Sequence, residues 1–336
     1  MKKHDSAIAQ EAPPLLISRA GLGWGLLGVA AFSLTVPLTR LAVADGGLAP
    51  LFTGTGRAVV AALLAAGALV LTRQRLPRPW QWARLGLVAA GIVVGFPVLT
   101  SLALTGTGAA HSAVVIGLLP AATATVAVLR TGERPGARFW AMVALGAVAA
   151  VAFATLTGAA PGPPDLFDLL LFGAVVTAAL GYAEGGLLAR ELGAWQTVSW
   201  ALVLSAPVTL PLTLWSLSQH PPQATAAQWA AFAYLALVSM YLGFFAWYRG
   251  LAIGPMARVS QVQLTQPVMT ITWAALLLGE PLTGPVLAGG AAVLACAAVA
   301  VRARLEPGTH ERGRTHTGWL RPRGRAATLR RSSRPG

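Results

Sequence analysis

Long apolar runs separated by short polar connections dominate the chain. Each run continues for about twenty residues, the length that one helix needs to cross the hydrocarbon core of a bilayer. The pattern predicts ten membrane-spanning helices, near residues 22–43, 51–71, 85–104, 109–129, 139–156, 169–189, 197–217, 229–247, 256–278 and 285–301. The expected fold class is therefore an all-α integral membrane protein.

The fourth and ninth predicted spans are related to each other. When the segment 104–133 is shifted by 147 positions along the chain, ten of its thirty residues meet an identical residue. The identities include Pro120 with Pro267, Thr123 with Thr270, and the Gly-Glu pair that closes each copy. Two related hydrophobic halves are typical of a transporter that arose by duplication.

The repeat predicts how the chain is divided. Two five-helix halves are expected at residues 21–157 and 158–303, between an N-terminal tail of residues 1–20 and a disordered basic tail of residues 304–336. Because five is an odd number, the two halves should be inverted relative to each other. If both termini are cytoplasmic, thirteen Lys and Arg before residue 302 lie inside and two lie outside, as the positive-inside rule requires. The expected location is the cell (inner) membrane.

Composition excludes soluble classes of protein. Only 11% of the residues are charged and the mean hydropathy is +0.65, whereas about 25% of a soluble domain is charged. The net charge of +14 lies mainly in the inside flanks and the basic tail, so the expected partner is the lipid bilayer and not nucleic acid. The tail either contacts anionic lipid at the inner leaflet or is solvated without a role.

The sequence contains little that an enzyme could use. No ATP-binding loop, metalloprotease motif or serine-hydrolase motif occurs, and four of the five His lie in tails or loops, so neither a metal nor another cofactor is expected. A rival function, an integral-membrane enzyme such as a lipid or polyprenyl transferase, would need paired carboxylates like the single pair Asp165 and Asp168. A channel or a scaffold would not need a duplicated polar span. The chain is expected not to be an enzyme.

One acidic residue lies within the sixth predicted span. A carboxylate at the depth of Glu184 costs on the order of 3 kcal/mol on insertion scales, so it should face the bundle interior or water. We expect Glu184 and the nearby Tyr182 to line a cavity, where Glu184 either carries a coupling proton or binds an amino group of the cargo. The alternative is that Glu184 snorkels to the cytoplasmic surface.

The ninth predicted span is polar on one helical face, which carries Gln263, Gln266 and Thr270. The first copy keeps only Thr123 of these three, so the repeat is polar on one side alone. A lining of an aqueous cavity explains the pattern, and hydrogen bonding between helices is the alternative.

Three further residues are candidates for a role in transport. Pro120 and Pro267 each free a backbone carbonyl and are expected to act as helix hinges. Arg57, in the second predicted span, is either an anchor for the substrate or a structural charge bonded to carbonyls of the outer loops.

A family resemblance rests on four blocks: Trp24-Gly-Leu-Leu-Gly-Val-Ala-Ala-Phe-Ser, Gly56-Arg57, and the apolar-Pro-apolar segments that end in Gly132-Glu133 and Gly279-Glu280. They resemble the EamA-type branch of the drug/metabolite transporter superfamily over about residues 20–303. The resemblance implies ten helices in two inverted five-helix repeats around a central cavity. It also implies a transporter that exports or exchanges small-molecule substrates by alternating access. We expect a secondary active transporter that is a monomer or a homodimer. Members carry many kinds of cargo, so the fold does not identify the substrate; an amino-acid-like or amphipathic metabolite is expected.

Overall fold

The computed structural model describes residues 14–131, 165–253 and 262–305, with a few single positions between 137 and 148 and Val259. Within these described residues the chain forms helices joined by short turns, and no strand occurs. The helices belong to one unit, Met1–Leu305. The predicted tails lie mostly outside the description, which omits residues 1–13 and 306–336.

Seven stretches of the described chain are long and apolar enough to cross a membrane: Ala20–Gly46, Pro50–Leu71, Pro79–Ala103, Ala109–Arg130, Leu166–Leu192, Ala194–Gln219 and Ala226–Ile253. They fall at seven of the ten predicted positions. A shorter apolar helical stretch, Val262–Leu278, lies at the ninth position, and α15 (Gly284–Leu305) lies at the tenth. The predicted fifth span, 139–156, lies almost entirely outside the described residues, so the count of ten stays a prediction.

The first span begins earlier than predicted and is broken in the middle. It consists of α1 (Pro14–Ser33) and α2 (Thr35–Val43), so the helix starts inside the segment expected to be a polar tail. Pro37 lacks the N–H that would bond the carbonyl of Ser33 four residues earlier. The hydroxyl of Thr270 donates to that carbonyl at 2.9 Å. Since a backbone group in a bilayer must find its partner within the protein, Thr270 stabilises the break.

Two other spans contain a π-helical segment. These segments are η2 (Ala89–Gly95), between α4 (Pro79–Val88) and α5 (Phe96–Ala103), and η3 (Leu235–Leu242), between α11 (Ala226–Tyr234) and α12 (Gly243–Ile253). A shift of 147 positions places η2 on residues 236–242, so the two segments occupy equivalent places in the halves. Such segments are rare and often mark functional sites. The duplication therefore extends to a backbone feature that sequence identity does not reveal.

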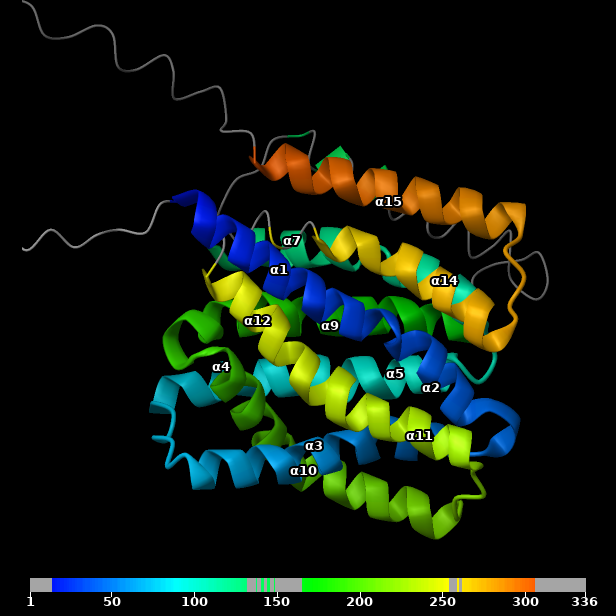
Figure 1. Cartoon of the computed structure of the whole chain (residues 1–336), viewed down its shortest axis with the longest axis horizontal. Helices are drawn as coiled ribbons and strands as arrows, with labels where there is room; N and C mark the ends of the chain where they lie inside the picture. The colour runs from blue at the N-terminus through cyan, green and yellow to red at the C-terminus, as the bar shows by residue number, and fades with distance from the viewer. Residues whose placement is uncertain are drawn as a thin grey trace, which may run out of the picture. The chain divides into compact units, whose positions relative to one another are not determined.

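Helices from both halves pack against one another. In Figure 1, α3 (Pro50–Leu71) and α10 (Ala194–Gln219) run side by side, and α1 lies against α12. The longest helix, α9 (Leu166–Leu192), contacts α4, α5 and α7 (Leu119–Thr131) of the first half and α10 and α12 of the second. Side chains of α9 therefore pack against helices of both halves.

The contact between α1 and α12 depends on small residues, which allow two helices to approach closely. A Cβ at Gly28 would lie 2.8 Å from the backbone nitrogen of Trp247. We expect Gly28→Ala to force the helices apart and to reduce the free energy of unfolding by about 1–3 kcal/mol, measured as a lower melting temperature in detergent. Gly23→Ala is the control, because a Cβ there meets nothing within 4 Å. Equal melting temperatures for the two variants would contradict this packing.

Candidate functional site

A cavity lies where the two halves meet. Its lining, which defines the central cavity, consists of Phe32, Thr35, Val36, Arg57, Ile92, Phe96, Pro97, Ala178, Tyr182, Ser239, Met240, Phe244 and Gln266. Three pairs of lining residues are related by the 147-residue shift: Thr35 with Tyr182, Ile92 with Ser239, and Pro97 with Phe244. Ile92 and Ser239 belong to the two π-helical segments. The cavity is therefore built in part from equivalent positions of the repeat.

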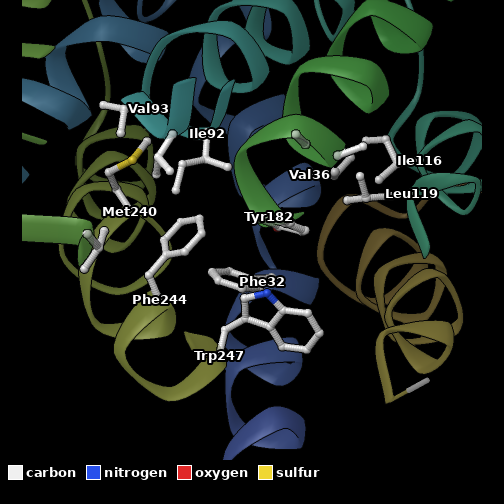
Figure 2. Close-up of a cluster of buried hydrophobic side chains, with 14 of the residues drawn as sticks. Phe32, Val36, Ile92, Val93, Ile116, Leu119, Tyr182, Met240, Phe244 and Trp247 are labelled. Atoms are coloured by element: carbon white, nitrogen blue, oxygen red, sulfur yellow. The ribbon is translucent and has the colours of Figure 1, made fainter. Parts of the chain in front are cut away.

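Aromatic side chains form one wall of the central cavity. The ring centroids of Phe32 and Phe244 lie 4.8 Å apart, and Tyr182 meets Phe244 edge-on at 6.0 Å. Figure 2 shows these rings together with Trp247, whose ring centroid lies 5.9 Å from that of Tyr182. The wall offers an apolar surface to whatever enters.

The polar groups of the central cavity come from both halves. The hydroxyls of Thr35 and Ser239 share a buried hydrogen bond of 2.7 Å, which joins α2 to η3. The side-chain oxygen of Gln266 is buried and accepts no hydrogen bond from the residues that the structure describes. Gln266 thus brings an unused acceptor to the cavity.

Arg57 is the one strongly basic residue of this lining. It is 1% exposed, and Nε, Nη1 and Nη2 are buried without a hydrogen-bond partner among the described residues. The sequence left open that Arg57 is a structural charge bonded to carbonyls of the outer loops. Among the described residues, no such carbonyl bonds Arg57. A buried guanidinium without a partner is costly, by several kcal/mol.

A second cavity adjoins the first and shares Val36 and Gln266 with it. Its lining is Val36, Ala113, Ile116, Leu119, Pro120, Gln263, Gln266, Pro267 and Thr270. The structure therefore brings together the three polar residues predicted on the ninth span and both predicted hinges. Three repeat-related pairs face this space: Ile116 with Gln263, Leu119 with Gln266, and Pro120 with Pro267. Thr123 is not part of either lining, and its buried hydroxyl has no partner among the described residues.

The two prolines lie at helix starts and not within continuous helices. Pro120 is the second residue of α7, after a turn that follows α6 (Ala109–Ile116). Pro267 is the second residue of α14 (Gln266–Leu278), after the short 3₁₀ segment η4 (Val262–Thr265). Proline suits the first turn of a helix because no intrahelical bond there needs its missing N–H. The expected kink is thus a break just ahead of each proline.

Glu184 lies apart from both linings. It is 2% exposed, its Oε1 pairs with Arg84 Nε, and its Oε2 lies 2.8 Å from Arg130. Arg84 also pairs with Glu191 at 2.8 Å. These four residues, the Glu184 cluster, tie α4, α7 and α9 together. The sequence did not reveal the partners, since Arg84 and Arg130 are 100 and 54 positions from Glu184.

The central cavity is narrow in this conformation. The volume open to water is about 20 Å³, and one water needs roughly 10–15 Å³ on the same measure. A metabolite could enter only if the surrounding helices moved apart.

Comparison with known proteins identifies the family. The EamA-like transporter family matches the chain twice, at residues 19–155 and 166–302, which reproduces the offset of the sequence repeat. "Uncharacterized transporter YdeK" from Bacillus subtilis (strain 168) is 44% identical over 282 residues, 83% of this chain and 97% of that protein. A solved crystal structure, described only as that of a protein, has a TM-score of 0.60 at 16% identity, covers 86% of this chain and 98% of its own, and supports the fold alone. The chain is a multi-pass membrane transporter and belongs to the EamA-like transporter family.

Proposed function

We propose that this transporter is secondary active and exports or exchanges small amino-acid-like or amphipathic metabolites by alternating access. The proposal rests on the central cavity, because its lining includes three pairs of residues at equivalent positions of the two halves. If the ten-helix, inverted arrangement holds, exchanging the conformations of the two halves turns an opening on one side into an opening on the other. A site between the halves would then face each side in turn.

Local backbone features near the cavities support such motion. Cavity-lining residues adjoin each of these features, which are the helix breaks at Leu34, before Pro120 and before Pro267, and the two π-helical segments. Interrupted helices can change direction at a few residues while the rest of each helix moves as a rigid body. Pro120 and Pro267 are therefore the proposed hinges.

Protons are the proposed coupling ion, with Glu184 as the carrier. In this conformation the carboxylate of Glu184 pairs with two arginines. Protonation would remove its charge and weaken both pairs, which would loosen α7 from α9, while Arg84 would keep its pair with Glu191. The proton would in this way be linked to the conformational equilibrium.

The proposed orientation places both termini in the cytoplasm and the protein in the inner membrane, by the distribution of Lys and Arg. Reporter fusions after Pro77 and Ala303 should then read cytoplasmic, whereas fusions after Gly162 and Gln223 should read external. An external signal at Ala303 would contradict the arrangement.

The membrane-enzyme alternative is not favoured. The acidic pair that it would need is engaged elsewhere: Asp165 accepts the backbone N–H of Asp168 at the start of α9, and Asp168 Oδ1 lies 2.8 Å from His111 Nε2. Both carboxylates thus have structural partners.

The proposed function is tested by comparing metabolites in cells and medium between a deletion strain and a strain that overproduces the protein. At least one small metabolite should move from cells to medium on overproduction and be retained on deletion. Ala178→Phe, which fills the central cavity, should abolish the difference, whereas Leu71→Phe, at a residue 85% exposed, should preserve it. Unchanged export by the Ala178 variant would contradict a cargo path through this cavity.

A further inference from the structure

We propose that Arg57 anchors a carboxylate, or another single acidic group, of the cargo, so that the central cavity accepts organic anions and zwitterions with an apolar body and rejects organic cations. This inference rests on the proposed function only in taking the central cavity as the cargo site.

Arg57 carries a buried charge that no described residue pairs. The guanidinium of Arg57 is buried in α3, lines the cavity, and has no hydrogen-bond partner among the described residues. A buried charge is normally paired, because removing it from water is costly. A carboxylate supplies that pairing in the geometry that suits arginine, since two parallel N–H donors match its two oxygens.

Within the described lining, no acidic side chain competes for Arg57. The central cavity has neither Asp nor Glu in its described lining. Glu184, two residues after the lining residue Tyr182, is bound to Arg84 and Arg130. An organic cation would therefore enter a poorly hydrated space in which Arg57, the one charged side chain of the described lining, has the same sign, and the repulsion there is stronger than in water.

The other residues of the central cavity indicate the chemistry of the rest of the ligand. Phe32, Phe96, Phe244, Met240, Ile92 and Val36 offer apolar surface. The unused side-chain oxygen of Gln266 can accept a hydrogen bond from an ammonium or amide group. A molecule with one acidic group, a nearby N–H donor and an apolar body would satisfy Arg57 and Gln266 together.

Lipid is a poor candidate for the acidic ligand. Arg57 is 1% exposed, so its charge does not lie on the outer surface of the helix bundle. The anion must come through the cavity itself, as a soluble molecule would.

The test measures binding to the purified full chain in nanodiscs, by calorimetry, for three probes that share one apolar body. 3-Phenylpropionate should bind at least tenfold more tightly than 3-phenylpropionamide, which corresponds to about 1.4 kcal/mol, and 3-phenylpropylammonium should bind most weakly. Arg57→Gln should remove the preference for the carboxylate, and Arg57→Lys should keep part of it as a point charge. Arg249→Gln is the matched control: Arg249 stacks on Trp24 and is outside the lining, so this variant should keep the wild-type order.

Three results would overturn the inference: equal or tighter binding of the ammonium probe, an unchanged order in Arg57→Gln, or no binding by any probe. The order of affinities of the three probes for the unmodified protein tests the inference even where a variant fails to fold. Carboxylate binding without any exported metabolite would contradict the proposed function and leave this inference intact. Export of organic cations through the cavity would contradict this inference and leave the proposed function intact.

Discussion

Glu184→Gln is expected to abolish accumulation of cargo against a gradient while exchange across the membrane persists. Glutamine keeps the shape of the side chain but can neither carry a proton nor hold the charge that pairs with Arg84 and Arg130. The variant should also lose about 2–3 kcal/mol in free energy of unfolding, less than a fully buried pair would lose, because Arg130 is half exposed. Uphill transport in proteoliposomes and denaturant unfolding measure the two effects.

Glu191→Gln is the matched control for this result. Glu191 pairs with Arg84 in the same cluster, but its side chain is 36% exposed. Exposed ion pairs contribute about 0–1 kcal/mol, so stability and uphill transport should stay close to those of the unmodified protein. If Glu184→Gln accumulates cargo with an unchanged dependence on pH, the coupling site lies elsewhere and Glu184 is structural.

Glu280→Ala is expected to loosen the start of α6 and to cost about 1–3 kcal/mol. The two carboxylate oxygens of Glu280 each accept a backbone N–H, from Ala109 and Ala110, at 2.8 Å. These are among the N–H groups that a helix leaves unsatisfied at its N-terminus, where a negative charge is also favoured. Without Glu280, both groups lose a charged partner.

Melting temperature in detergent and hydrogen exchange at the amides of Ala109 and Ala110 measure this loss. Glu280→Gln keeps one acceptor oxygen and should lie between the two extremes. Unchanged exchange at both amides in Glu280→Ala would show that the bonds do not hold the helix. The equivalent residue of the first copy, Glu133, lies outside the described residues.

The sequence predicted the features that depend on local chemistry and on duplication. Hydropathy located seven spans because a bilayer demands a minimum apolar length whatever the helices later contact. The 147-residue offset came from identities such as Pro120 with Pro267, and the family matches repeat it. The polar face of the ninth span predicted that Gln263, Gln266 and Thr270 lie together, and they do, because residues three apart share a face in the 3₁₀ segment η4 as well as in α14.

The features that could not be predicted from the sequence depend on how the helices pack against one another. The partners of Glu184, and Ser33 as the acceptor for Thr270, come from segments far along the chain, and no local pattern announces them. Ser239 was also missed, although a signal existed: it is a polar residue in an apolar span, and the offset pairs it with Ile92. The π-helical segments that carry both residues left no recognised trace in the sequence.

The most direct test of the central claim is the accessibility of a cysteine at Ser239. Only Cys296 must be removed first, since the chain has one cysteine. In a Cys296→Ala background, Ser239→Cys should react with a membrane-impermeant thiol reagent both in intact cells and in inside-out vesicles, because in the proposed transport cycle the cavity faces each side in turn. Gln219→Cys and Arg75→Cys, at opposite ends of the helices, should each react from one side only. Reaction of Ser239→Cys from a single side, or from neither, would contradict alternating access through the central cavity.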